Sequence, residues 1–325
     1  AFFDANGDGH LDLYVASGSS EFDVYALGLL DHLFFGDGHG AFKDSHQKLP
    51  NKGFESSSVV VPYDFDQDGD MDLFVGGRQR AGYYGVPTNS HLLENDGSGK
   101  FTNMTQNRAP LFLKLGMVTD ALTTDLDQDG VEELIVVGHW MAPKVFKSHQ
   151  NQLIDATDQF ELGGYAGLYN TIAKGDFNED GYVDLIFGNQ GTNSRYHAST
   201  DYPLGLLVND FDQNGSIDLI ASMFQDGEEY PFVQLKDLTM QLPYIKKKYL
   251  KFFDFKEATL QEIFGEKITR GGYHLKVNEL KSFVWMNDPD QEYVRVDLPF
   301  NFQLFPIYDF LVDDFNTDGY IDLLA

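Results

Sequence analysis

The sequence predicts an all-β protein, a β-propeller of four-stranded antiparallel blades that carries a helical insertion. Three observations predict this fold. A nine-residue acidic pattern occurs six times within 325 residues. A glycine-rich turn follows the early copies in nearly constant register. The composition, with 28 Phe, 17 Tyr and 32 Gly, suits many short strands joined by tight turns.

The acidic pattern places oxygen-bearing side chains at positions 1, 3, 5 and 9, and Gly at position 6. Position 7 varies, as expected of a residue that offers only its backbone carbonyl. The predicted ligands at positions 1, 3, 5, 7 and 9 are Asp4, Asn6, Asp8, His10 and Asp12; Asp64, Asp66, Asp68, Asp70 and Asp72; Asp125, Asp127, Asp129, Val131 and Glu133; Asp176, Asn178, Asp180, Tyr182 and Asp184; Asp210, Asp212, Asn214, Ser216 and Asp218; and Asp314, Asn316, Asp318, Tyr320 and Asp322.

Calcium takes about six to eight oxygen ligands, and alternate side chains can supply them if the backbone curls around the ion. Glycine at position 6 permits the sharp bend. Ordinary turns favour the same residue types, but six copies with one alternation favour a metal. Magnesium seldom uses such cages, and zinc prefers Cys and His. The sequence therefore predicts up to six bound Ca²⁺ ions, with Asn214 marking a weaker site.

The second marker is a polar turn that ends in an aromatic residue. It spans Gly36–Phe42, Asn95–Phe101 and Asn287–Tyr293, and a weaker version ends at Leu153. The next acidic loop starts 21 to 24 residues later: Phe42 to Asp64, Phe101 to Asp125, Leu153 to Asp176 and Tyr293 to Asp314. Two markers in register define a four-stranded unit, with strands A and B around the acidic loop and C and D around the turn.

The regular spacing fails twice. The loops at Asp176 and Asp210 are 34 residues apart with no glycine-rich turn between them, so either the fourth unit has lost strands or the two loops share one blade. The loops at Asp210 and Asp314 are 104 residues apart. Apolar residues at helical spacing predict a helical insertion over about 234–270, with one apolar face formed by Leu235, Leu238, Leu242, Ile245, Tyr249 and Phe252.

The composition excludes several classes of protein. Asp and Glu outnumber Lys and Arg by 51 to 23, so the net charge of −28 disfavours nucleic acid as a partner. The absence of Cys excludes disulfides and thiolate metal sites. No apolar run is long enough to span a membrane. Because the chain opens and closes beside a repeat, we expect a single domain over 1–325 that is a piece of a longer protein.

The stretches Asp64–Val75 and Asn95–Phe101 resemble FG-GAP/VCBS repeats, which occur in the propeller of integrin α subunits and in cartilage acidic protein-like chains common in Bacteroidota. The resemblance covers nearly the whole chain. It implies a propeller of roughly six to eight blades, with seven favoured, and calcium at the acidic loops. It implies an extracellular, cell-surface or periplasmic location, with association to a bacterial outer membrane favoured. It implies no reaction.

A ligand is expected on the face opposite the calcium loops, where the B–C and D–A loops lie and the helical insertion should form a partial cap. The B–C loops carry aromatic, amide and guanidinium groups that suit a glycan or protein ligand. The candidate binding residues are Arg78, Arg80, Tyr84, His139, Trp140, Asn193 and Arg195. The alternative is that these residues are packing and solvated loop positions.

The sequence predicts a calcium-binding recognition or adhesion module, and not an enzyme. A polysaccharide lyase is the enzymatic alternative, with His139 or Tyr84 as base and Arg78 or Arg80 neutralising a uronate. A scaffold in a surface assembly is the third hypothesis. The lysines at 246, 247, 248 and 251 form the only basic run, either as a solvated helix face or as a docking site for an acidic partner.

Overall fold

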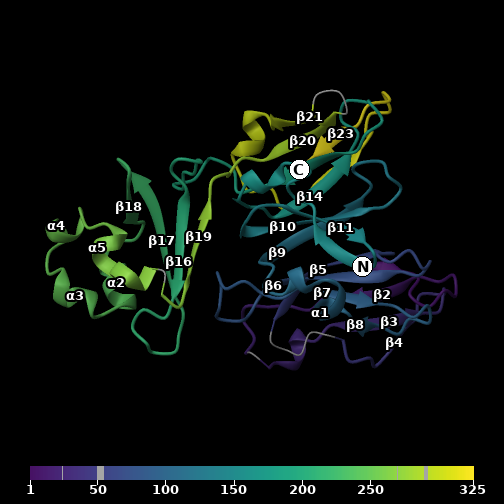
Figure 1. The fold of residues 1–325 in the computed structure, drawn as a ribbon, viewed down its shortest axis with the longest axis horizontal. Coiled ribbons are helices and arrows are strands. Elements are labelled where there is room, and N and C mark those ends of the chain that lie inside the picture. The colour runs from purple at the N-terminus through teal and green to yellow at the C-terminus, as the bar shows by residue number, and fades with distance from the viewer. Residues whose placement is uncertain (24, 50–54, 269, 289–291) are drawn as a thin grey trace.

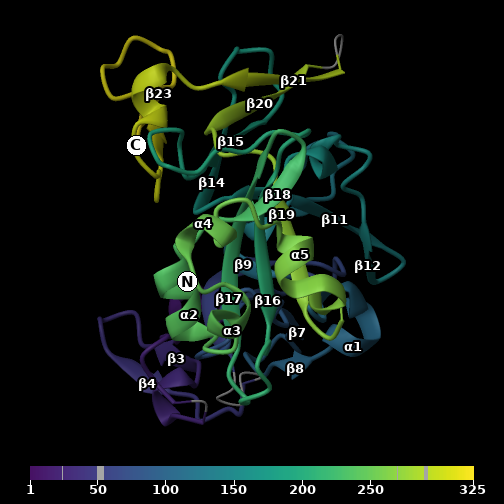
Figure 2. The same cartoon turned by 90° about the vertical axis from the view of Figure 1, so that its left-hand side faces the viewer.

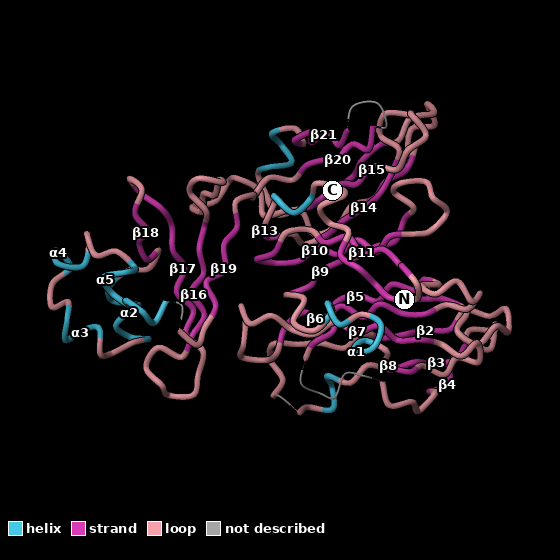
Figure 3. The backbone as a smooth tube through the Cα atoms, in the orientation of Figure 1, coloured by secondary structure: helices cyan, strands magenta, loops and turns pink. Residues whose placement is uncertain are grey.

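The computed structural model describes residues 1–23, 25–49, 55–268, 270–288 and 292–325. The protein is mostly β, and its strands form several four-stranded antiparallel sheets (Figures 1 and 3). The prediction of repeated four-stranded antiparallel units is therefore confirmed. Of the glycine-rich turn predicted at Asn287–Tyr293, residues 289–291 lie outside the described part of the chain.

The first three sheets follow the chain in order, each as a meander in which successive strands pair. An acidic loop joins the first two strands of each sheet. The strands are β1 (Phe2–Phe3), β2 (Asp12–Val15), β3 (His32–Gly36) and β4 (Phe42–Asp44); β5 (Ser56–Tyr63), β6 (Asp72–Gln79), β7 (His91–Glu94) and β8 (Thr102–Asn103); and β9 (Met117–Thr124), β10 (Glu133–Met141), β11 (Lys144–His149) and β12 (Gln152–Asp155), with β13 (Gly167–Leu168) beside the end of β10.

The fourth sheet is split by a long insertion. Its strands β14 (Thr171–Gly175) and β15 (Asp184–Gly188) flank the fourth acidic loop, whereas β20 (Phe283–Asp288) and β21 (Glu292–Asp297) come about ninety residues later. Strand β15 pairs directly with β20, with Phe187 opposite Phe283. The fourth unit has therefore lost no strands, and both explanations offered for the short spacing are wrong, because its outer strands follow the insertion.

The fifth acidic loop belongs to a sheet of its own within this insertion. Its strands lie in the order β18 (Glu228–Pro231), β17 (Asp218–Gln225), β16 (Leu204–Asn209) and β19 (Tyr273–Val277). The last strand, β19, therefore pairs with the first strand, β16, whereas in the repeated sheets the last strand pairs with the third. We call β16–β19 the inserted sheet. Figure 1 shows it beside the stack of the other sheets, with the helices on its far side, and in Figure 2 it lies in front of them. The insertion is thus larger than the predicted helical segment.

The predicted helical segment forms α2 (Leu235–Gln241), α3 (Ile245–Lys248), α4 (Phe252–Phe255) and α5 (Leu260–Phe264). Thr259 caps α5 through a reciprocal bond with Glu262. One continuous apolar face is not formed, because Pro243 interrupts the helical hydrogen bonds after α2. Leu238, Leu242, Ile245 and Tyr249 are buried as expected, but Phe252 is 65% exposed.

Consecutive sheets pack face to face through apolar cores. One core joins the second and third sheets around Phe74 and Phe146, and another joins the third sheet to the split sheet around Phe187 and Trp285. The split sheet packs in turn against the hairpin of β22 (Leu311–Asp313) and β23 (Asp322–Leu324), which carries the sixth acidic loop. The sheets thus pack one on the next in chain order, from the first sheet to this hairpin.

Side-chain hydrogen bonds connect the first strands of neighbouring sheets. Ser58 Oγ in β5 donates to the carbonyl of Val118 in β9 at 2.8 Å. Thr171 Oγ1 in β14 donates to Asp120 Oδ2 in β9 at 2.9 Å. The first strands of the second, third and split sheets therefore lie side by side along a common centre, where blades of a propeller place their innermost strands.

Candidate functional sites: the acidic loops and the opposite face

The first carboxylate of each acidic loop fixes the bend. In all six loops it accepts a hydrogen bond from the N–H of the glycine at position 6, at 2.8–3.0 Å. It also accepts one from the N–H of position 5. These glycines have φ between +84° and +98°, which L side chains rarely adopt: Gly9, Gly69, Gly130, Gly181, Gly215 and Gly319.

The ninth-position carboxylate connects the acidic loop to the glycine-rich turn. Asp72 is 1% exposed, and its Oδ1 accepts from the N–H of Asn95 at 2.8 Å, while its Oδ2 accepts from Phe65. Asp12 makes the equivalent bonds to Gly36 and Ala5. Loops and turns therefore lie at the same end of the sheets, as the sequence predicted.

The oxygens of three loops converge as a cation requires. In each, ligand atoms from positions 1, 3 and 9 lie within 4.8 Å of one another: Asp64, Asp66 and Asp72; Asp125, Asp127 and Glu133; Asp210, Asp212 and Asp218. In the second loop, the buried oxygens Asp66 Oδ1 and Asp70 Oδ1 have no hydrogen-bond partner. Burial, followed by the charges of Asp68 and Glu94, raises the pKa of Asp66. A bound Ca²⁺ would satisfy these oxygens, so the second loop fits the ion.

The third loop already holds a cation. Lys147 of β11 places Nζ 2.6 Å from Asp127 Oδ2, 2.6 Å from Asp129 Oδ2 and 3.2 Å from Glu133 Oε1. Burial of the ammonium opposes its charge, yet the hydrogen bonds to these carboxylates raise the pKa of Lys147. Because the ammonium contacts ligand positions 3, 5 and 9, this loop does not fit a calcium ion while Lys147 stays in place.

The other face carries a connected polar group near the common centre of the sheets. Arg78 lies at the far end of β6 from Asp72, and its Nη2 is 3.1 Å from His139 Nδ1. Tyr84 Oη is 3.0 Å from the same nitrogen and accepts from Trp140 Nε1 at 3.1 Å. The structure thus brings together Arg78, Tyr84, His139 and Trp140, four of the predicted ligand residues.

Asn170 is the member of this group that the sequence analysis missed. Its Oδ1 lies 3.0 Å from His139 Nε2, and its buried Nδ2 has no hydrogen-bond partner among the described residues. No motif marks Asn170, which follows β13 and reaches the site only because β13 pairs with β10. We call Arg78, Tyr84, His139 and Asn170 the polar centre.

His139 is neutral in this setting. Burial, followed by the charge of Arg78, lowers the pKa of His139 to about 4. With Nε2–H donating to Asn170, Nδ1 is the acceptor for Arg78 and Tyr84. The neighbouring Trp140 has φ +60°, where β10 shifts register against β13. A strained backbone beside a buried polar network is typical of functional sites.

A hollow of about 340 Å³ opens beside the polar centre. It is lined by residues of six separate chain segments, namely Gly18, Ser19, Ser20, Ser56, Ser57, Ser58, Arg78, Gln79, Thr119, Asn170 and Tyr308. Hydroxyl and amide groups predominate in this lining. The hollow thus lies where residues of several repeated sheets meet, with Ser56, Ser57 and Ser58 from β5 and Thr119 from β9.

The inserted sheet contacts part of this face, whereas the helices of the predicted partial cap lie on its far side (Figure 1). A methyl group at Gly85 would lie 2.5 Å from Val208 Cγ2 of the inserted sheet, so the backbone there is in close contact with β16. Trp140 packs with Tyr196 and Leu204 in the seam between the insertion and the third sheet. The indole ring of Trp140 therefore packs in this seam.

The remaining predicted ligand residues lie outside the polar centre. Arg80 stacks its guanidinium 4.6 Å from the ring of Tyr83. The Asn193 N–H donates to the carbonyl of Gln303, and Arg195 stacks 4.8 Å from the ring of Phe232 in the insertion. Both Asn193 and Arg195 are exposed. They are not brought into contact with Arg78.

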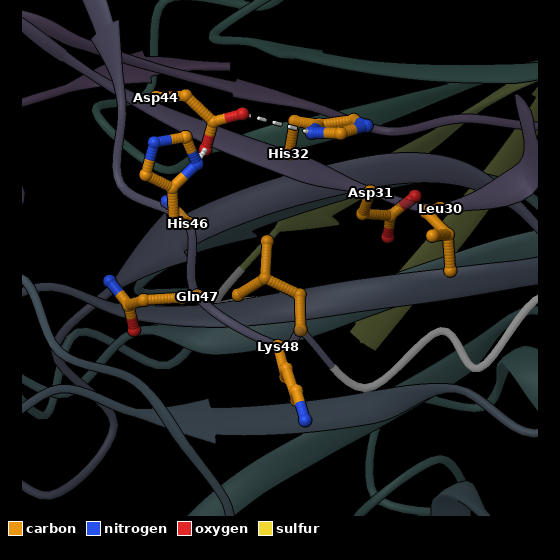
Figure 4. Close-up of a pocket in the computed structure, with 8 residues that line it drawn as sticks. Leu30, Asp31, His32, Asp44, His46, Gln47 and Lys48 are labelled. Atoms are coloured by element: carbon orange, nitrogen blue, oxygen red, sulfur yellow. Dashed lines mark hydrogen bonds and ion pairs between the residues drawn. The ribbon is translucent and has the colours of Figure 1, made fainter. Parts of the chain in front are cut away.

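A second hollow, of about 450 Å³, lies on the outer strands of the first sheet (Figure 4). His32 and His46 point their Nδ1 atoms at different oxygens of Asp44, at 3.6 and 3.4 Å. Both histidines are strongly exposed. Among the described residues, several groups of side chains lie close enough together to hold a metal ion, and His32, His46 and Asp44 do not form one of them. We assign no function to this hollow.

Residues 4–75 and 125–187 match the family described as the FG-GAP-like repeat. The chain therefore contains FG-GAP-like repeats, and the matched segments include the first four acidic loops. A search of curated proteins finds no match. Among the described residues, no helix is long and apolar enough to cross a membrane.

Proposed function

We propose that this protein is a calcium-binding β-propeller that recognises a glycan or protein ligand outside the cell or at the cell surface. The FG-GAP-like repeats, the four-stranded sheets and their shared centre support a ring of about six to eight blades, with seven favoured. The convergent acidic oxygens of the second and fifth loops support calcium as the structural ion. The ions would hold the A–B loops, leaving the opposite face to bind.

The polar centre is the observation that carries the proposal. Arg78 supplies a guanidinium beside a hydroxyl-lined hollow, and Asn170 Nδ2 is a buried donor with no partner. A carboxylate or hydroxyl of a glycan would satisfy both donors. Since His139 is neutral, the net charge of this group is positive, in contrast to the chain as a whole.

A glycan and peptide array, probed with Arg78→Ala and with Asn170→Ala, tests the proposal. We expect each variant to lose on the order of ten-fold or more in affinity, because a hydrogen bond to a charged group is worth roughly 1.5–3 kcal/mol. Arg270→Ala removes an equal charge at an exposed position and is the matched control. Unchanged binding by both test variants would contradict this location for the ligand.

A polysaccharide lyase is the second candidate function, and one observation favours it. Arg78, Tyr84 and His139 lie together, as a proton abstraction beside a neutralised uronate requires. However, His139 Nδ1 already accepts from Arg78 and Tyr84, so it is not a free base in this arrangement. Incubation with polyuronates distinguishes the two functions, since a lyase produces an ultraviolet-absorbing unsaturated product and a binding module leaves the polymer intact.

A further inference from the structure

The helical end of the insertion exposes large apolar side chains. Leu250 is 80% exposed, Phe252 65% and Phe253 70%, all within four residues of chain. Met240 on α2 is 73% exposed. Figure 1 places α3 and α4 at the end of the molecule farthest from the repeated sheets. These side chains therefore project from a protruding end.

Lysines surround these apolar side chains. Residues 246–257 contain five lysines and two acids, Asp254 and Glu257, in a chain of net charge −28. Lys248 donates to the carbonyl of Glu262, and Lys256 pairs with Glu257 at 3.0 Å. In the described part of the chain, Lys246, Lys247 and Lys251 are exposed and form no ion pair. Their ammonium groups are available to a partner.

We propose that this end of the insertion docks on the surface of an anionic lipid bilayer. We call Leu250, Phe252, Phe253 and the lysines at 246, 247 and 251 the docking patch. Phe and Leu side chains can enter the acyl boundary, while lysine stems extend their ammonium groups to the lipid phosphates. The acidic remainder of the protein would be repelled by the same surface, so the charge distribution orients the molecule with its helical end toward the lipid.

A bilayer fits this patch better than a folded protein partner. A specific protein interface buries about 800 Å² on each side and centres on a fitted pocket. The patch instead presents a few exposed apolar side chains and lysines on a protruding end of the molecule (Figure 1). A fluid interface accepts such a shape without a complementary surface.

Vesicle sedimentation tests the proposal, with phosphatidylglycerol mixed into phosphatidylcholine and with phosphatidylcholine alone. We expect wild-type protein to sediment with the anionic vesicles only. The double variant Phe252→Ser and Phe253→Ser should lose on the order of ten-fold or more in partitioning. The triple variant Lys246→Gln, Lys247→Gln and Lys251→Gln should lose more, since each lysine contributes about five-fold near an anionic surface.

Matched controls separate docking from general effects. Phe300 and Phe305 are 71% and 70% exposed on another part of the protein, so Phe300→Ser with Phe305→Ser removes equal apolar exposure. Lys43 in β4 and the loop residues Lys100 and Lys114 are exposed lysines outside the insertion, and their change to Gln removes equal charge. We expect both controls to bind vesicles as wild type does.

Several results would overturn the proposal. One is an absence of wild-type binding to anionic vesicles, and another is equal binding to neutral ones. At one fixed calcium concentration, equal binding of wild type and the Phe252/Phe253 double variant would indicate calcium bridging through the acidic loops instead. Binding of the patch to soluble polyglutamate but not to vesicles would indicate an acidic protein partner. Melting curves of all variants confirm that the fold is retained.

Discussion

The carboxylate of Asp184 accepts a hydrogen bond from the backbone N–H of Asn287 at 2.8 Å, although 103 residues separate them. Its other oxygen accepts from the N–H of Phe177 at 2.8 Å. The buried Asp184 thus connects the fourth acidic loop to strand β20 across the whole insertion. The same arrangement at Asp72 spans only 23 residues. The split sheet therefore keeps the hydrogen-bond pattern of an uninterrupted repeat.

Asp184→Asn should destabilise the protein even without calcium. The amide presents an N–H where the carboxylate accepted from Phe177 or Asn287, so one buried donor loses its partner. We expect a loss of about 1–3 kcal/mol in unfolding free energy, measured by denaturant titration in excess chelator. Asp201→Asn removes the same charge at an exposed site and should change little. Equal stability of the two variants would contradict this role for Asp184.

The insertion should be removable. Gly191 N donates to the carbonyl of Leu280 at 2.7 Å, so the chain leaves and re-enters the split sheet at neighbouring points. Replacing residues 192–279 by an Asn-Gly turn should preserve the pairing of Phe187 with Phe283. The insertion has its own core around Phe211 and Leu238, which supports independent folding.

We expect the shortened protein to unfold cooperatively and to bind one calcium ion fewer, because the fifth loop is removed. Calorimetry gives both quantities. Loss of the seam with Trp140 should lower the melting temperature without abolishing the transition. Failure to unfold cooperatively, with the isolated insertion also unfolded, would show that the two parts depend on each other.

The sequence predicted the repeated units because each one repeats a local rule. The bend at Gly69 needs only its own nine residues, and the strands around it need only alternation. The strand partners of β15 could not be predicted, since nothing local distinguishes a strand that pairs with the next segment from one that pairs with β20. Long-range pairing depends on the whole fold.

Residues of the candidate sites were predictable to different degrees. Arg78 and His139 were found because they lie near the ends of strands that begin at acidic loops. Asn170 carries no such signal. Lys147 was not singled out, because a lysine on a strand is ordinary until the side chain is seen to reach Asp127. Tertiary contacts between neighbouring strands supply that information, and spacing along the chain does not.

Lys147→Met should open the third loop to calcium. The ammonium now balances Asp127, Asp129 and Glu133, and its removal leaves their charges unopposed. We expect the variant to bind one calcium ion more than wild type by titration calorimetry, and to be less stable than wild type in chelator. Lys144 lies on the same strand and pairs outward with Asp155, so Lys144→Met is the control. An unchanged ion count would contradict occupancy by Lys147.

Calcium removal should destabilise wild-type protein through the other loops. With dissociation constants near 10⁻⁴ M and millimolar calcium, each ion adds about 1–2 kcal/mol. Calorimetry with and without chelator should therefore show a lower melting temperature without calcium. The buried oxygens Asp66 Oδ1 and Asp70 Oδ1, which lack partners, make the second loop a principal contributor. Identical melting curves would remove calcium from any structural role.

Acid should destabilise the protein partly through His139. Its pKa of about 4 when folded lies below the ordinary value of 6.5, so the unfolded chain binds more protons between these values. Stability from this group is present above about pH 6.5 and is lost as the pH falls toward 4. From about pH 7 to pH 5 the loss is roughly 2 kcal/mol.

His139→Asn should therefore weaken the pH dependence of unfolding by that amount, measured by denaturant titrations at fixed calcium. As a control, changing the exposed His149 to Asn should leave the pH dependence as in wild type. The groups that contact His139 (Arg78, Tyr84 and Asn170) carry no acid that could reverse the sign. If wild type and His139→Asn lose equal stability over this range, His139 is not held neutral by burial beside Arg78.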